Sequence, residues 1–485
     1  FDGDFTNFER LVLNDTTKDG VADASGDGND YNVTFIDGNA NEQQVWNGSA
    51  WVDDANVDFV VDGNTLNSNQ VMTFDGSAES SAEFSVLGGA ASDALTTGAG
   101  DDTIFGGAGN DVINGGAGAE YLQGEAGDDT FNINDDQLSS ADTIDGGAEA
   151  NTLTFLADAQ HEDDVDFTNV TNVQTVRLAD GAGSTLHLGA EAEAGGVDFV
   201  YGASGDDVID ASSQAANLTG TQESVGGSNA GYTTGIMIDG GSGSDKIAGG
   251  TAADELLGGT GADSIWGNDG ADSITGGAGA DYVVAGAGND VVYSFGTEGG
   301  ANDLVDGSYN LTDTMIGGTG TDELVLSADH TVNFTANFSE FETITLVNNT
   351  TESTVTGAGD NYDLTFVDGN VAAGQTLTIN GAALTGEPVG TQAADTLRVD
   401  ASAETNGGYI ITGGSFNDTL IGGNLADYVN DSVNGYLADT ISGGAGDDVI
   451  VGNAGKDYLS GGAGNDRLNI NNVMVNALQS AMGQG

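Results

Sequence analysis

Apolar residues recur every nine positions along much of this chain, with glycines and an acid at fixed places between them. In residues 240–293 the frame appears six times, as GGSGSDKIA, GGTAADELL, GGTGADSIW, GNDGADSIT, GGAGADYVV and AGAGNDVVY. Positions one, two and four are mostly glycine, position six is aspartate and position eight is apolar. This spacing does not match a helical period, whereas a glycine turn followed by a short strand fits it. We therefore expect each nonad to form one turn and one strand.

Nonads of this kind stand in several blocks. They occupy residues 88–132, 202–210, 240–293 and 413–469, and a further copy, GGTGTDELV, begins at Gly317. One copy carries Glu120 at position six, and a worn copy contains Asp439. The sixth-position residues that we expect to bind a metal ion are Asp93, Asp102, Asp111, Asp129, Asp207, Asp245, Asp254, Asp263, Asp272, Asp281, Asp290, Asp322, Asp418, Asp427, Asp448, Asp457 and Asp466.

The residue types of the nonad indicate a calcium site. Glycine tolerates positive φ, so the glycines allow backbone carbonyl oxygens to turn towards one point. The sixth-position carboxylate adds oxygen ligands, and calcium accepts roughly six to eight of them. No histidine or cysteine is placed to favour zinc or copper. We expect multiple calcium ions, about one per stacked turn, although copies such as GGTAADELL lack the fourth glycine and are expected to bind weakly.

The strand half of the nonad predicts the fold. The apolar eighth residue, such as Ile265 or Ile274, starts a strand whose side chain points into the coil. Two nonads then make a coil of about 18 residues with a turn at each edge, and neighbouring turns share an ion. The predicted class is all-β: an elongated right-handed parallel β-roll or β-helix solenoid with calcium-binding nonapeptide turns.

A longer repeat lies over the nonads. The segments FTNFERLVL, FTNVTNVQTVRL and FSEFETITL align Phe8, Val173 and Phe341 at separations of 165 and 168 residues. We therefore predict three modules, at residues 1–160, 161–333 and 334–485. Each begins with strand-rich segments and continues into nonads.

Composition limits the partners. The 485 residues include 7 Lys+Arg against 77 Asp+Glu, a formal charge of −70, so bound cations are expected to form part of the folded state. Nucleic acid is excluded as a partner because so few basic side chains are present. No segment is long and apolar enough for membrane insertion, and none resembles a secretory signal peptide. The chain has no cysteine, so disulfides cannot stabilise its fold, and bound metal ions are expected to do so instead.

The nonads resemble those of the RTX (repeat-in-toxin) family of secreted Gram-negative bacterial proteins. The copies GGAGNDVIN, from Gly106, and GGAGNDRLN, from Gly461, are close to ideal. This resemblance implies type I secretion, an unfolded chain in the low-calcium cytoplasm, and folding outside the cell. The segment FSEFETITL is similar to repeated strand segments of RTX-containing S-layer and large surface proteins, which implies an extracellular or cell-surface location.

We find no catalytic constellation in the sequence and expect no enzyme. His161 precedes Glu162, but no second histidine completes a zinc-protease signature, and no G-x-S-x-G motif occurs. The acids of DTTKDGVADASGDGND, from Asp15, form either an additional calcium loop or a solvated polar loop. The tyrosines at seventh positions are predicted to point outward; they are Tyr121, Tyr282, Tyr428 and Tyr458. The three tryptophans either contact a sugar or pack against strands; they are Trp46, Trp51 and Trp266.

Three functions remain open. The first is a structural protein that self-associates into a surface layer or filament, with a cell-surface polysaccharide as a further partner. The second is the rigid, calcium-stiffened stalk of an adhesin, and the third is the RTX region of a secreted hydrolase. Three equivalent modules without catalytic residues favour the first two. The absence of an obvious cap at either end favours joining to other chains.

Overall fold

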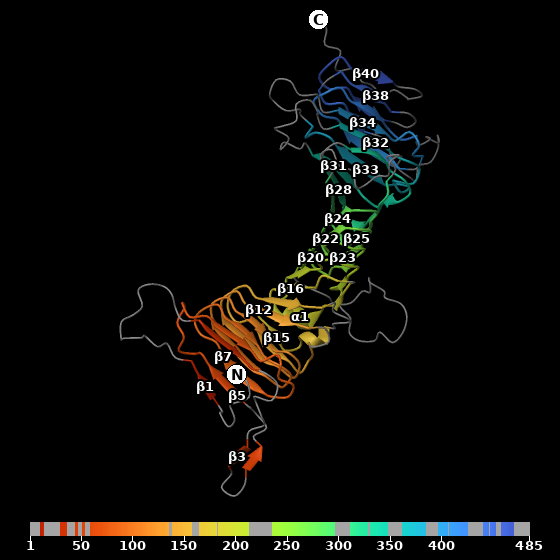
Figure 1. Cartoon of the computed structure of the whole chain (residues 1–485). Coiled ribbons are helices and arrows are strands. Elements are labelled where there is room, and N and C mark those ends of the chain that lie inside the picture. The colour runs from red at the N-terminus through yellow and green to blue at the C-terminus, as the bar shows by residue number, and fades with distance from the viewer. Residues whose placement is uncertain are drawn as a thin grey trace, which may run out of the picture. The chain divides into compact units, whose positions relative to one another are not determined.

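The computed structural model is almost entirely β. It describes residues 10–13, 30–35, 44–46, 51–53, 59–134, 138–157, 164–181, 183–212, 235–295, 311–327, 330–347, 361–384, 396–405, 407–424, 440–445, 447–452 and 457–469. Among these residues are one α-helix, α1 (Ala190–Gly195), and one 3₁₀ helix, η1 (Asp164–Phe167); every other regular element is a strand. The predicted parallel β-roll class is confirmed, and α1, which the sequence pattern did not predict, packs beside the end of the first sheet (Figure 1).

The chain divides into two compact units, Phe1–Lys246 and Ile247–Gly485. Strand β21 (Lys246–Ala248) contains the boundary. The three sequence modules remain a prediction.

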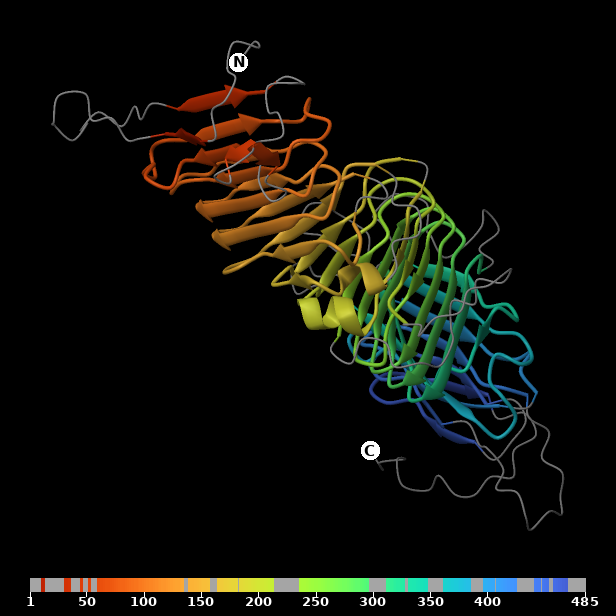
Figure 2. The same ribbon diagram turned by 90° about the horizontal axis from the view of Figure 1, so that it is seen from below.

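Alternate strands of the first unit enter two parallel sheets. The first sheet consists of β1 (Arg10–Val12), β5 (Phe59–Asp62), β7 (Phe84–Leu87), β9 (Thr103–Ala108), β11 (Tyr121–Ala126), β13 (Thr143–Asp145) and β15 (Val170–Thr171). The second consists of β2 (Tyr31–Thr34), β6 (Met72–Asp75), β8 (Ala94–Thr96), β10 (Val112–Asn114), β12 (Thr130–Ile133), β14 (Thr152–Phe155), β16 (Thr175–Arg177), β18 (Phe199–Tyr201) and β20 (Met237–Asp239). In Figure 2 the strands coloured orange lie one below the next as the rungs of successive coils.

Two further strand pairings belong to the first unit. A parallel pair is formed by β17 (Thr185–His187) and β19 (Val208–Asp210). An antiparallel hairpin is formed by β3 (Gln44–Trp46) and β4 (Trp51–Asp53).

The second unit repeats the coil plan. Its longest sheet consists of β22 (Glu255–Thr260), β24 (Ser273–Ala278), β26 (Val291–Phe295), β28 (Glu323–Ser327), β31 (Thr343–Val347), β33 (Thr376–Asn380), β35 (Gly408–Thr412), β37 (Thr440–Ser442) and β39 (Tyr458–Ser460). The alternate strands pair in two separate parallel series. One series consists of β23 (Ser264–Asp269), β25 (Tyr282–Gly288), β27 (Thr314–Gly320) and β30 (Phe338–Ser339). The other consists of β29 (His330–Asn333), β32 (Asn361–Thr365), β34 (Thr396–Asp400), β36 (Thr419–Ile421), β38 (Val449–Val451) and β40 (Arg467–Asn469).

The eighth-position apolar residues form the core, as predicted. Ile113 is the register partner of Leu95 on one side and of Phe131 on the other, and all three are fully buried. In the second unit Ile274 lies between Leu256 and Val292 in the same way. Each buried side chain of this size contributes about 1.5–3 kcal/mol of hydrophobic stabilisation. The core is therefore a stack of equivalent apolar layers, which holds neighbouring coils in register and so brings their turns together.

Candidate metal centres

The sixth-position acids stack on one another at the edges of the coils. In the first unit the backbone N–H of Asp93 donates to Oδ1 of Asp111 (2.7 Å), and the N–H of Asp111 donates to Oδ1 of Asp129 (2.8 Å). Each carboxylate thus accepts a hydrogen bond from the residue that stands 18 positions earlier, one coil back. The parallel register is what allows this, because equivalent positions of successive coils lie side by side.

The same arrangement recurs on other edges of both units. In each row the backbone N–H of one residue donates to the side chain of the next. In the first unit one row runs through Phe84, Asp102, Glu120 and Asp142, and another runs through Ser184, Asp207 and Asp245. In the second unit the rows are Asp254, Asp272, Asp290, Asp322 and Glu342, then Asp263, Asp281 and Asp313, then Leu397, Asp418, Asp448 and Asp466.

Some members of these rows were missed by the sequence analysis. Asp142 follows Glu120 by 22 residues, Asp313 follows Asp281 by 32 and Glu342 follows Asp322 by 20. Insertions between the coils break the nine-residue frame while the stacking continues. A local sequence pattern could have identified two of them. Asp142 and Asp313 each stand two residues before an inward apolar residue, as a sixth-position acid does.

The second carboxylate oxygen of several acids in these rows is buried without a hydrogen-bond partner. This is true of Oδ2 in Asp111, Asp129, Asp272, Asp290, Asp322 and Asp448, all of them buried side chains. An unsatisfied buried polar atom costs about 1–3 kcal/mol, and more when it is charged. Such a repeated cost requires a compensating positive group at each turn.

Burial changes the acidity of these groups. Desolvation raises the pKa of Asp111 to about 7, that of Asp272 to about 8 and that of Glu120 to about 9. Neighbouring acids of the same row raise these values further, whereas the backbone N–H bonds lower them. Without a cation, burial therefore favours the protonated form of these three carboxyls at near-neutral pH.

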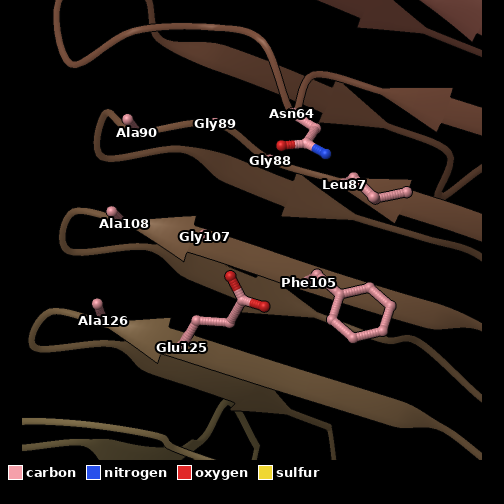
Figure 3. A pocket seen from close by; sticks show the side chains of 10 residues that line it. All are labelled: Asn64, Leu87, Gly88, Gly89, Ala90, Phe105, Gly107, Ala108, Glu125 and Ala126. Atoms are coloured by element: carbon pink, nitrogen blue, oxygen red, sulfur yellow. The ribbon is translucent and has the colours of Figure 1, made fainter.

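The turns beside the acids are built closely around them. A Cβ at Gly106 would overlap Oδ2 of Asp111, and a Cβ at Gly124 would overlap Oδ2 of Asp129. Figure 3 shows three stacked turns, with Ala90, Ala108 and Ala126 in a column at their tips. In these two turns, glycine at the first position leaves room for the carboxylate oxygen.

Asn151 marks where the positive group belongs. It holds the sixth position of a nonad-like turn, and its Oδ1 accepts the N–H of Asp129 (2.9 Å) as an aspartate would. Its amide nitrogen, in the place of Oδ2, donates to the carbonyl oxygens of Asn172 (2.9 Å) and Ala148 (3.3 Å). Ala148 belongs to the same turn and Asn172 to the next coil. A carboxylate turn has Oδ2 in place of this donor, so a cation there would satisfy Oδ2 and the equivalent carbonyl oxygens together.

This donor set fits calcium. Among the described residues, no three Asp, Glu, His or Cys side chains gather around one point. The oxygens available to an ion are instead one carboxylate per turn and the backbone carbonyl oxygens of neighbouring turns. Hard oxygen ligands from flexible loops suit calcium better than zinc or copper. Bound calcium neutralises the acids and joins one coil to the next.

The structure places most of the predicted ligands in such turns. Asp93, Asp102, Asp111, Asp129, Asp207, Asp245, Asp254, Asp263, Asp272, Asp281, Asp290, Asp322, Asp418 and Asp448 are buried, and Asp457 and Asp466 are half-buried. Asp427 and the loop that begins at Asp15 lie outside the described residues. Among the seventh-position tyrosines, Tyr121, Tyr282 and Tyr458 are exposed, whereas Tyr428 also lies outside the described residues.

A family model for the RTX calcium-binding nonapeptide repeat matches several stretches of the chain. The matches cover residues 87–119, 114–132, 194–215, 239–274, 257–292, 410–430 and 433–468. No curated protein matches the chain. Within the described part, no helix has the length and hydropathy that crossing a membrane requires.

Proposed function

Because this chain carries RTX repeats, which bind calcium and are typical of secreted proteins, we propose that it is an extracellular structural protein. Calcium stiffens its coils, and copies of the chain assemble into a bacterial surface layer or filament. The proposal includes export by type I secretion and no enzymatic activity.

Calcium supports the structural part of this proposal. Rows of stacked acids accompany the coils of both units, and each ion joins two coils. The formal charge of −70 opposes folding in the absence of cations. Because the sites form only when the coils stack, calcium binding and folding are thermodynamically coupled. The chain is thus largely unfolded where calcium is scarce, and its coils are folded and rigid where calcium is plentiful.

The observation that carries self-assembly is the last described coil. Leu468 in β40 occupies the inward register position, yet 38% of its surface is exposed, whereas its register partner Ile450 and the next residue of that layer, Leu420, are fully buried. In the described part of the chain, β40 pairs with β38 alone. An apolar layer and a strand edge of this kind match the coil of a second copy.

Electron microscopy of the purified chain tests the proposal. With calcium we expect ordered sheets or fibres, and a chelator dissolves them. Leu468→Glu places a charge in the uncovered layer and abolishes the assemblies. Val112→Glu is the matched control, since Val112 is similarly exposed on an outward face of β10, and it assembles normally.

Two results would overturn the proposal. Isolated rods in the native chain at every calcium concentration favour the stalk of an adhesin. Assemblies that persist in Leu468→Glu show that the end of the coil is not the contact.

A further inference from the structure

The nonad turns fall into two groups that differ in the direction of one peptide bond. In three turns the second-position N–H points inward and donates to Oδ2 of the sixth-position acid. The pairs are Gly89 with Asp93 (2.7 Å), Gly250 with Asp254 (2.6 Å) and Gly414 with Asp418 (2.8 Å). We call these closed turns. In two of them the other oxygen is also hydrogen-bonded to a backbone N–H: Oδ1 of Asp93 accepts the N–H of Met72 (2.7 Å), and Oδ1 of Asp418 accepts that of Leu397 (2.9 Å).

In other turns the same N–H points outward. The N–H of Gly116 donates to the side chain of Asn114 (3.0 Å), and that of Gly241 donates to Asp239 (3.1 Å). Gly116 and Gly241 have φ of +83° and +88°, whereas Gly89, Gly250 and Gly414 lie outside the left-handed region. The C=O and N–H of a trans peptide point in opposite directions. An outward N–H therefore turns the first-position carbonyl oxygen inward, and we call these turns open.

The two groups present opposite charges to the carboxylate. An open turn directs carbonyl oxygens towards a carboxylate oxygen, and oxygens without a hydrogen donor between them attract a cation. A closed turn puts an N–H dipole in the same place. That N–H donates to the carboxylate oxygen that an ion would otherwise bind. The turn also directs no first-position carbonyl oxygen towards an ion, so the hydrogen bond takes the place of the ion.

The fourth residue of the nonad differs between the three closed turns and the two open turns described above. All three closed turns lack glycine there, with Ala91, Ala252 and Phe416 in its place. In the open turns this residue is glycine, as at Gly118 (φ +156°) and Gly243 (φ +147°). The turns around Asp111, Asp129, Asp272 and Asp290, whose Oδ2 atoms have no partner, also carry it. Residues with a Cβ rarely adopt this φ, so glycine at the fourth position favours the open form. It is not required for it, because the turn of Asn151 has Glu149 there at φ +67°, and its second-position N–H, at Gly147, donates outward to Asp145 (3.0 Å).

We propose that the direction of the second-position N–H decides whether a turn holds calcium, that glycine at the fourth position favours the direction that holds it, and that the turns of Asp93, Asp254 and Asp418 hold none. These three acids are among the ligands expected from the sequence, and the proposal reassigns them. Each is the first carboxylate of its row within its unit. Three rows therefore begin with a hydrogen-bonded turn that forms without metal, on which the calcium turns stack.

The direct test is a crystal structure of the native chain grown with calcium. Anomalous scattering is expected at the turns of Asp111, Asp129, Asp272 and Asp290. No peak is expected beside Oδ2 of Asp93, Asp254 or Asp418. A calcium peak at any of these three turns overturns the proposal. The test depends on calcium binding alone and is independent of whether the chain assembles.

Counting bound calcium by equilibrium dialysis gives a second test in solution. Asp93→Asn is expected to keep the native count, whereas Asp111→Asn, its neighbour in the same row, loses about one ion or more. Ala91→Gly opens a closed turn and gains about one ion, whereas Ala108→Gly, at the third position of an open turn, gains none. Equal counts in the two asparagine variants, or no gain in Ala91→Gly, contradict the proposal.

Discussion

The backbone N–H of Asp111 donates a 2.8 Å hydrogen bond to Oδ1 of Asp129, a residue 18 positions later in the chain. This bond joins consecutive coils through a carboxylate, and it leaves the other oxygen of Asp129 buried without a partner. One oxygen therefore sets the spacing of the coils and the other attracts the ion. The two tasks can be separated by substitution.

Asp272→Asn separates them in the second unit. Asparagine keeps an acceptor for the N–H of Asp254, which bonds to Oδ1 of Asp272 at 2.9 Å, but it removes the charge. We expect folding to require more calcium. Losing one ion removes about 2.7 kcal/mol of stability when calcium is at 100 times its Kd. Urea unfolding followed by circular dichroism at several calcium concentrations measures this loss. The exposed Asp269→Asn serves as the control, and an equal loss there refutes the assignment.

Asn151→Asp is the reverse experiment. It replaces the amide nitrogen that donates to Asn172 and Ala148 with a carboxylate oxygen. Without calcium the stability should fall by about 1–3 kcal/mol, because buried oxygens then face one another. Saturating calcium should restore most of this loss. Asn114→Asp is the control, since Asp239 performs the task of Asn114 in another turn. A loss that calcium does not reduce speaks against a cation in this position.

Gly288→Ala tests how closely the turns stack. A Cβ at Gly288 would overlap the carbonyl oxygen of Gly270 one coil back, and the backbone there has φ of +159°. Gly374→Ala shares the positive φ, at +85°, but its Cβ meets no atom within 4 Å. We expect Gly374→Ala to cost about 1 kcal/mol, the cost of left-handed backbone, and Gly288→Ala to cost considerably more. Thermal unfolding in calcium compares them, and equal shifts would exclude the close contact.

The calcium-free protein should become more stable in acid. In the unfolded chain the aspartates ionise near pH 4, whereas burial raises the pKa of Asp129 to about 6, of Asp111 to about 7 and of Asp272 to about 8. Folding therefore favours the protonated form. This stabilisation is complete below about pH 4 and is lost as the pH rises through the range from about 6 to 8.

Calcium reverses this dependence because it binds the ionised carboxylates. Strand content of the calcium-free chain, followed by circular dichroism, should rise between pH 8 and pH 4.5. That of the calcium-loaded chain should fall or stay constant. A calcium-free chain whose spectrum is the same at both pH values would show that the buried acids do not oppose folding.

Most of the coil follows from the nine-residue pattern. The eighth-position residues Ile265 and Ile274 are fully buried, as their spacing predicts. The calcium assignment follows from the glycines and the acid at position six, and the family match supports it. These features are local, because one turn and one strand need only nine residues, so a single sequence suffices to predict them.

Residues that join the rows across an insertion were not predictable in this way. Glu342 accepts the N–H of Asp322 at 2.8 Å, but it stands outside any nonad, and Gln174 accepts the N–H of Asn151 at the same distance. Their places depend on which coils stack, and the length of the intervening loop does not determine this. The helix α1 was not predicted for a related reason. It has only six residues and lies between two strands of the coil, so it is too short to show a helical pattern in the sequence.

By itself, the sequence determined that the chain coils, that its turns contain oxygen ligands for calcium, and that its charge requires cations. The tertiary structure alone decided which oxygens still need an ion. Asp93 and Asp111 have the same place in the nonad, yet the N–H of Gly89 bonds to Oδ2 of Asp93, whereas Oδ2 of Asp111 has no partner. The physical reason is the direction of one peptide group, which depends on the backbone conformation of the whole turn and on the coil stacked against it.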